Sequence, residues 1–205
     1  MRLVVARKPV RRILHGTQRL LFGGAVAMLA YCAFVLIDTW TFQNGEHRQL
    51  ERVLAARQAV SPMAPVNLPR PTNGGLIGRL EIPRLGLSAI VMEGTSSTTL
   101  RRAVGHISGT ALPGKPGNVG VSGHRDTFFR PLRNIRQGDI VTFTTLQGEY
   151  RYRVVSTKVV GADDIAVLHP SESEILTLIT CHPFYFVGSA PDRFIVRAER
   201  VGKDS

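Results

Sequence analysis

The chain has 205 residues, of which 43% are hydrophobic and 20% charged, and its formal net charge at pH 7 is +11. Six of its 26 basic residues lie among the first nineteen positions, where no acidic residue occurs, so the rest of the chain has 20 basic and 15 acidic residues. That smaller excess is spread along the chain, mostly as Arg, without the basic helix or interleaved aromatic residues of a nucleic-acid-binding surface. The composition therefore argues against nucleic-acid binding.

An apolar segment follows the basic amino terminus. Residues 20–37 form an unbroken run of 18 apolar or Gly residues between Arg19 and Asp38, which is long enough to cross the hydrocarbon core of a bilayer. Trp40 and Phe42 then lie where an interface between membrane and water is expected. The run therefore predicts a membrane-spanning helix.

The basic residues before this segment predict its orientation. Because Lys and Arg are retained on the cytoplasmic side, residues 1–19 are expected to form a cytoplasmic tail, residues 20–42 a single-pass anchor, and the remaining chain to be extracytoplasmic. A cleavable signal peptide is the alternative. Its apolar region is normally shorter, and no small-x-small cleavage site follows this run before the polar residues begin, so an uncleaved anchor is favoured.

Residues 43–75 are expected to form an extracytoplasmic stalk and linker. Apolar residues at helical spacing predict a short amphipathic helix over residues 45–60. Four prolines within residues 61–75, followed by Asn73-Gly74-Gly75, cannot continue a helix or a central strand and predict a semi-rigid linker. Residues 76–205 are then numerous enough for one compact domain with its own core.

This last domain has the pattern of a mainly β fold. Short strand-like runs occur at residues 80–82, 118–123, 140–143, 150–154, 175–180 and 193–198. The Gln147-Gly148 pair between two of these runs predicts a hairpin, and residues 98–104 and 129–135 are candidates for short helices. Many short strands in a domain of this size favour a closed or nearly closed β-barrel over a sandwich, because closure removes exposed strand edges.

Cys181 is the one cysteine of this domain, and Cys32, the other cysteine of the chain, lies inside the apolar segment. Cys181 therefore has no expected disulfide partner within the chain, although paired thiols are the norm outside the cell membrane. One interpretation is a buried cysteine that acts as a small apolar side chain. The other is a catalytic nucleophile, which needs a nearby base or cation because an ordinary thiol is mostly protonated at neutral pH.

Four histidines in the domain could serve as that base: His106, His124, His169 and His182. His182 adjoins Cys181, but on a continuing strand its side chain points to the opposite face. His124 follows a strand of small residues and stands where a side chain could project from the rim of a barrel, so it is the first candidate. A structural or surface role is the alternative for any single histidine.

Arg193 is the candidate cation. Residues 183–191 contain two prolines and a glycine and connect two strand-like runs, which predicts an antiparallel pair joined by a loop. The end of the first strand then lies beside the start of the second, so Cys181 and Arg193 become neighbours. A guanidinium in that place can stabilise an oxyanion and favour the thiolate, whereas the alternative is an ordinary surface arginine.

These residues together carry a family resemblance. His124 within Gly-His-Arg-Asp-Thr-Phe-Phe, the run Thr177-Leu178-Ile179-Thr180-Cys181, and Arg193 twelve residues after the cysteine resemble the sortases, the membrane-anchored cysteine transpeptidases of bacterial surfaces. The resemblance covers about residues 76–200, and the Ile-Pro, Gly-Thr and Pro-Gly pairs that begin at positions 82, 94 and 113 are similar to the class D branch. It implies an eight-stranded sortase β-barrel with Cys181 as nucleophile, His124 as general acid and base, and Arg193 as oxyanion or substrate stabiliser, with no cofactor. Some sortases use calcium, but the acidic residues Asp163, Asp164, Glu172 and Glu174 lack the spacing of several oxygen donors that a calcium site requires, so no metal site is expected.

The resemblance also implies a substrate. Sortases cut a Leu-Pro-x-Thr-Gly-like sorting signal of a surface protein after the Thr, form a thioester with the cysteine, and pass the acyl group to an amine of a cell-wall precursor or a pilin Lys. In this chain Thr180 is expected to help form the substrate site, and Ile165 and Val167 are expected to line the peptide-binding region. The alternative for these two apolar residues is that they pack under their own loop. Two alternatives involve the same residues: a membrane-anchored cysteine peptidase that releases the thioester to water, and a non-enzymatic cell-surface scaffold with a structural cysteine.

Overall fold

The computed structural model describes residues 7–59, 72–185 and 188–202, and the chain divides into two compact units, residues 1–41 and residues 42–205.

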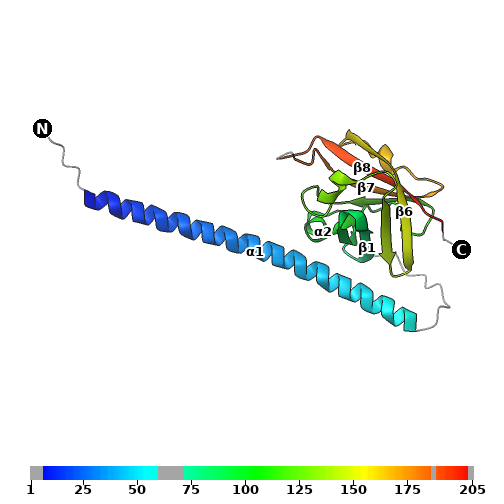
Figure 1. The fold of residues 1–205 in the computed structure, drawn as a ribbon, viewed down its shortest axis with the longest axis horizontal. Helices are drawn as coiled ribbons and strands as arrows, with labels where there is room; N and C mark the ends of the chain where they lie inside the picture. Colours follow the sequence, from blue (N-terminus) through cyan, green and yellow to red (C-terminus); the bar gives the residue numbers. More distant parts are fainter. Residues whose placement is uncertain (1–6, 60–71, 186–187, 203–205) are drawn as a thin grey trace. The chain divides into compact units, whose positions relative to one another are not determined.

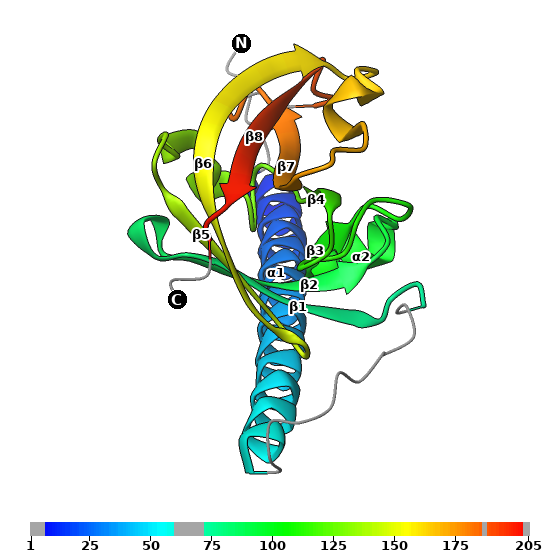
Figure 2. The ribbon, with the colours of Figure 1, turned by 90° about the vertical axis from the view of Figure 1, so that its right-hand side faces the viewer.

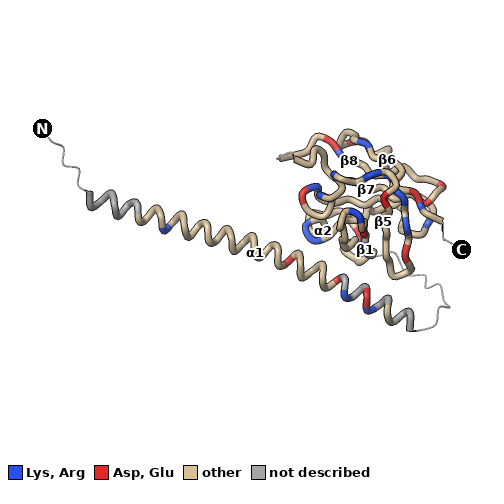
Figure 3. Tube along the Cα trace, viewed as in Figure 1, with Lys and Arg blue, Asp and Glu red and all other residues tan. Residues whose placement is uncertain are grey.

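One long helix, α1 (Arg7–Ala59), contains the apolar segment (Figure 1). Its part His15–Glu46 is long and apolar enough to cross a membrane, and the large apolar side chains of residues 20–40 are exposed. Figure 3 shows an uncharged stretch over the described residues 20–37. A helix suits such a segment because it satisfies its own backbone N–H and C=O groups.

The stalk differs from its expected form at one point. The amphipathic helix predicted for residues 45–60 is not a separate element, because α1 continues without interruption to Ala59. The predicted Pro-rich linker, residues 61–75, lies mostly outside the described residues, and only its end, residues 72–75, is described. The boundaries of the tail, anchor, stalk and catalytic domain therefore stay predictions.

Within the described residues, eight strands close into a barrel (Figure 2). The strands are β1 (Leu76–Ile82), β2 (Leu87–Glu93), β3 (Val104–His106), β4 (Gly117–Ser122), β5 (Ile140–Thr145), β6 (Gly148–Gly161), β7 (Glu174–His182) and β8 (Asp192–Arg200). Their order around the barrel is β1-β2-β3-β4-β7-β8-β6-β5, with β2–β3 and β4–β7 parallel and the other pairs antiparallel. The mainly β, closed eight-stranded barrel expected from the sequence is confirmed.

Short helices connect the strands. They are η1 (Pro83–Leu85), α2 (Ser97–Arg102), η2 (Arg130–Asn134) and η3 (Ile165–Leu168), of which the η elements are 3-10 helices. The helix predicted over residues 98–104 ends early, because Val104 begins β3 and is fully buried in the core. The hairpin predicted at Gln147-Gly148 is confirmed as the turn between β5 and β6.

The side chains of β7 alternate between the core of the barrel and its outer face. On β7, Leu176 and Leu178 are fully buried members of the core. Successive strand residues point to opposite faces, so Thr177, Ile179 and Cys181 lie on the outer face of the barrel. The interior is filled by side chains, and a reactive group must therefore lie on the outer face or at a rim to meet a ligand.

Candidate active site

The pairing of β7 with β8 brings Cys181 and Arg193 together. These two residues are direct register partners in the antiparallel pair. Opposite residues on neighbouring antiparallel strands project from the same face, with Cβ atoms about 4.5–5.5 Å apart. The sequence-based prediction that the two residues are neighbours is therefore confirmed, and both lie on the outer face.

The other neighbour of β7 is β4, and His124 follows the end of β4. The two strands are parallel, with Ser122 opposite Ile179, and the Gly123 N–H donates to the Ile179 carbonyl at 3.1 Å. This pairing extends one residue beyond β4 to Gly123, and His124 is the next residue of the chain. Three segments far apart in the sequence thus bring a histidine, a cysteine and an arginine to one edge of the barrel.

Accessibility fits this grouping. His124 is exposed, whereas Cys181 and Arg193 are half-buried, and Cys181 is a free cysteine. The Arg193 guanidinium donates from one nitrogen to the backbone carbonyls of Ala190 at 3.2 Å and Asp192 at 2.9 Å. These two bonds hold the guanidinium at the start of β8, in the residue that is opposite Cys181 in the strand register.

Thr180 lies on the inner side of the same strand end. It is 2% exposed, and its hydroxyl donates to the Gly123 carbonyl at 2.8 Å. Gly123 directly precedes His124, and Thr180 directly precedes Cys181, so one buried hydrogen bond joins the two segments that carry His124 and Cys181. In this structure Thr180 is a link between strand ends, and its expected contact with substrate stays a prediction.

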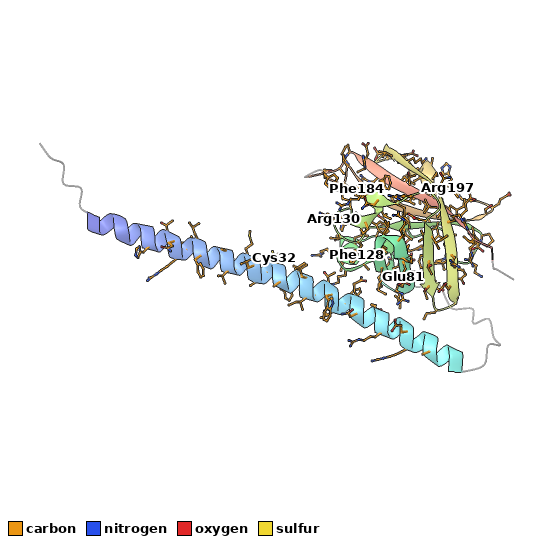
Figure 4. All side chains as sticks on the ribbon, viewed as in Figure 1. Cys32, Glu81, Phe128, Arg130, Phe184 and Arg197 are labelled. Carbon is orange, nitrogen blue, oxygen red and sulfur yellow. The ribbon has the colours of Figure 1, made fainter. Side chains whose placement is uncertain are left out.

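The remaining histidines have other surroundings. His182 packs edge-on against Phe184, with ring centroids 6.0 Å apart, and stacks on Phe194 at 6.3 Å; Figure 4 labels Phe184. His182 thus faces away from Cys181, as strand alternation predicted. His169 is exposed, in the connection that follows η3.

His106 is buried and belongs to the structural part of the barrel. Its Nδ1 lies 2.6 Å from Glu93 Oε2, and its Nε2 lies 2.9 Å from the Ala111 carbonyl. The carbonyl can only accept, so Nε2 carries a proton, and the second ring nitrogen is engaged by the carboxyl group. Both nitrogens of His106 are therefore occupied, which leaves His124 as the exposed histidine beside the cysteine.

The connection between β6 and β7 covers part of the outer face of β4 and β7. Asn118, which is buried, donates to the Val167 carbonyl at 2.9 Å and accepts from the Thr177 hydroxyl at 2.7 Å. Within η3, Ile165 is 75% exposed, whereas Val167 is 6% exposed. Ile165 is free to meet a ligand in this arrangement; for both residues the substrate-binding role stays a prediction.

Sequence reasoning missed the residues that hold the loops around the site. Arg125, directly after His124, donates to the carbonyls of Pro183 at 3.0 Å and Gly188 at 2.9 Å, in the β7–β8 connection. Arg133 of η2 donates to the Tyr185 hydroxyl at 3.2 Å. The basic residue next to the histidine was the one available signal, because loop contacts of this kind depend on tertiary structure.

Farther along β8, Arg197 is exposed and shares the outer face with Arg193 (Figure 4). In the described part of the chain, no group of three or more His, Cys, Asp or Glu residues is arranged to hold a metal ion.

Comparisons with known proteins show relatives of both the sequence and the fold. The Sortase domain family matches residues 80–201. Sortase D of Bacillus subtilis (strain 168) is 34% identical over 191 residues, which cover 88% of this chain and 96% of that protein. Among solved structures, Sortase A from Corynebacterium diphtheriae is 29% identical, with a TM-score of 0.61 over 75% of this chain and 85% of that chain. A Clostridium perfringens Sortase D5 transpeptidase, 24% identical, has the same fold, with a TM-score of 0.63 over 79% of this chain and 97% of that chain.

Proposed function

The chain belongs to the sortase family of cysteine transpeptidases, and we propose that it cleaves a Leu-Pro-x-Thr-Gly-like sorting signal through a thioester on Cys181 and transfers the acyl group to an amine. One observation carries this proposal. Cys181 is the direct register partner of Arg193 on β8, and the Thr180 hydroxyl, one residue before Cys181, donates to the carbonyl of Gly123, one residue before His124. Nucleophile, proton carrier and oxyanion stabiliser are the three groups that acyl transfer to a thiol requires.

In the proposed acylation step, the Cys181 thiolate attacks the carbonyl carbon of the Thr-Gly bond and the carbonyl electrons move to oxygen. The Arg193 guanidinium supplies positive charge and N–H donors to that oxygen. When the tetrahedral intermediate collapses, the C–N bond breaks and the departing amine takes a proton from the His124 imidazolium. The products are a thioester on Cys181, a free amino-terminal Gly peptide and a neutral His124.

In the proposed deacylation step, an amine attacks the thioester carbonyl and His124 accepts the amine proton. Collapse then forms an amide and releases the Cys181 thiolate, which restores the starting charges. The partners are surface proteins that carry a carboxy-terminal sorting signal, and the acceptor is an amine of a peptidoglycan precursor or a pilin Lys.

The apolar part of α1 supports the proposed location. A helix that is long and apolar enough to cross a membrane precedes the barrel in the chain, and six basic residues lie before its apolar run. By the positive-inside rule we place the amino terminus in the cytoplasm, with one membrane crossing and an extracytoplasmic catalytic domain. The barrel then lies on the side where surface proteins and cell-wall precursors occur.

A peptide assay tests the proposed chemistry. The full chain in detergent is incubated with a sorting-signal peptide, and mass spectrometry detects the acyl-enzyme. Cys181→Ala is expected to abolish the adduct, whereas Cys32→Ala, the matched change at the other cysteine, is expected to retain it. A normal adduct on folded Cys181→Ala protein would refute the nucleophile assignment, and unchanged biological function of that variant would favour a non-enzymatic scaffold.

The product distinguishes transfer from hydrolysis. With an added amine, the transpeptidase is expected to yield an amide product that increases with amine concentration at the expense of free acid. Free acid alone at saturating amine, across several candidate acceptors, would instead establish a cysteine peptidase.

A further inference from the structure

A hollow of about 550 Å³ lies between η1 and the segment that begins at η2. Its lining includes the three arginines Arg84, Arg133 and Arg136, together with Leu85, Asn134 and Ile135. None of these residues belongs to the proposed catalytic group. The hollow is therefore a feature separate from the Cys181 site, and its lining consists of described residues of one compact unit.

The nearby carboxylate is already engaged. Asp139 is buried, and its two carboxylate oxygens accept from the Nε and Nη2 atoms of Arg84, the second at 2.6 Å. The backbone N–H of Arg136 donates to the same carboxylate at 2.8 Å. Asp139 therefore neutralises Arg84, which also donates to the Asn134 carbonyl at 2.7 Å and is fixed in place at one side of the hollow.

The other two arginines leave the hollow with excess positive charge, because the carboxylate of Asp139, on which the charge of Arg136 also acts, carries one negative charge against the three positive charges of the lining. Both Arg133 and Arg136 are exposed, and among the described residues neither forms an ion pair with a carboxylate. The one side-chain partner of Arg133 is neutral, because its guanidinium donates to the Tyr185 hydroxyl and lies 5.6 Å from the centre of that ring. A guanidinium has five N–H donors, so this contact leaves donors of Arg133 available to a ligand.

We propose that this hollow is an anion-binding site that takes a phosphate group. Planar guanidinium groups match the oxygens of phosphate with paired, charge-assisted hydrogen bonds. Arg133 and Arg136 supply the positive charge, while the Arg84–Asp139 pair fixes the opposite wall. The side chains of Leu85 and Ile135 can pack against the carbon part of a phosphate ester. A free phosphate and the headgroup of an anionic lipid offer this same chemistry.

The test uses the full chain in phosphate-free maltoside micelles, with 13C-labelled methyl groups on Leu and Ile. Inorganic phosphate is titrated at constant ionic strength while NMR follows the methyl signals of Leu85 and Ile135. Saturable shifts of these signals are expected. Shifts that grow without saturation, or that match those given by chloride, would overturn the proposal.

Charge-removing variants locate the binding. Arg136→Gln is expected to weaken phosphate binding roughly tenfold, which is the effect of losing one charge-assisted contact. Arg101→Gln, at an exposed arginine of α2, is the matched control and is expected to change the affinity by less than about twofold. If Arg136→Gln does not fold, Arg133→Gln provides the same test. Equal losses at Arg101 and at the hollow would show a general charge effect and refute the site.

A second arm identifies the source of the phosphate. Dihexanoyl phosphatidylglycerol is added to the same micelles in place of inorganic phosphate. Binding that is tighter than that of inorganic phosphate, and is weakened by Arg136→Gln, assigns the hollow to a lipid headgroup. If inorganic phosphate binds more tightly than the lipid, and Arg136→Gln weakens its binding, the hollow is assigned to a soluble phosphate. If Arg136→Gln weakens the binding of neither probe, the proposal is overturned.

Discussion

Replacing Thr180 with Val keeps the branched shape of the side chain but removes the hydroxyl that donates to the Gly123 carbonyl at 2.8 Å. Thr180 is 2% exposed, so water cannot readily replace the lost donor. A buried carbonyl without a partner costs about 1–3 kcal/mol, and we expect Thr180→Val to lower the free energy of unfolding by that amount. Urea denaturation measures the change.

The same substitution is expected to affect catalysis through position. The lost bond joins the residue before His124 to the residue before Cys181, so its removal loosens the two segments that carry the proposed proton carrier and nucleophile. A displacement of about 1 Å in reacting groups can lower rates about 100-fold. We therefore expect the kcat/KM of peptide cleavage to fall roughly 10- to 100-fold, mainly through kcat.

Two further variants separate position from stability. Thr180→Ser retains the donor and is expected to keep the rate within a few-fold of the parent. Thr177→Val removes another buried hydrogen bond of β7, the one to Asn118, and is expected to lower stability without the large loss of kcat. A normal rate for Thr180→Val, or an equal loss of rate for Thr177→Val, would refute the positioning role of Thr180.

Three other outcomes follow from the same contacts. Arg193→Lys retains the charge but loses the planar fork, so single-turnover acylation is expected to slow roughly tenfold or more, and a normal rate would argue against oxyanion stabilisation. The hydrogen bond from Arg84 lowers the pKa of Asp139 in the folded protein. The ionised Asp139 carboxylate therefore contributes its full stabilisation above the unfolded-state pKa near ~3.9, and this stabilisation is lost as the pH falls through the lower folded-state pKa. Asp139→Asn should therefore lower the urea midpoint of unfolding relative to the parent at neutral pH, and this difference should disappear in acid. A difference in midpoint that stays constant with pH would contradict the prediction. Arg125→Ala removes both bonds to the β7–β8 connection and is expected to raise amide hydrogen exchange there, whereas Arg130→Ala, at an exposed neighbour, should not; equal exchange in the two variants would exclude the contact.

Local patterns predicted the elements that carry the site, and one contact between them. The strand of Cys181, the strand of Arg193 and their antiparallel pairing follow from alternation and from the Pro- and Gly-rich connection, whose length leaves the two residues opposite each other. The parallel pairing of β4 with β7 is different, because no turn links the strands and their register depends on the closed barrel. His124 was accordingly chosen by its place after a small-residue strand, without evidence for which strand it would join.

The parts that sequence did not reveal depend on long-range contacts. Asn118 and Thr177 are polar residues in strands, and nothing local indicates that they bond each other or fasten the connection that contains η3. The predicted helix over residues 98–104 includes Val104, the first residue of β3, because the three residues of this strand are too few to display an alternating pattern. Its extended form is set by its neighbours β2 and β4, with which it pairs.

The division of β7 into two faces explains why the order Thr180-Cys181 matters to the proposed chemistry. The inner-face residue uses its hydroxyl to bind the end of β4, and the outer-face residue is left free to react. Because side chains alternate with a period of two, a slip of one residue would bury the thiol and turn the threonine outward. It would also separate Cys181 from Arg193 and His124, so the register that closes the barrel is the same register that assembles the proposed catalytic group.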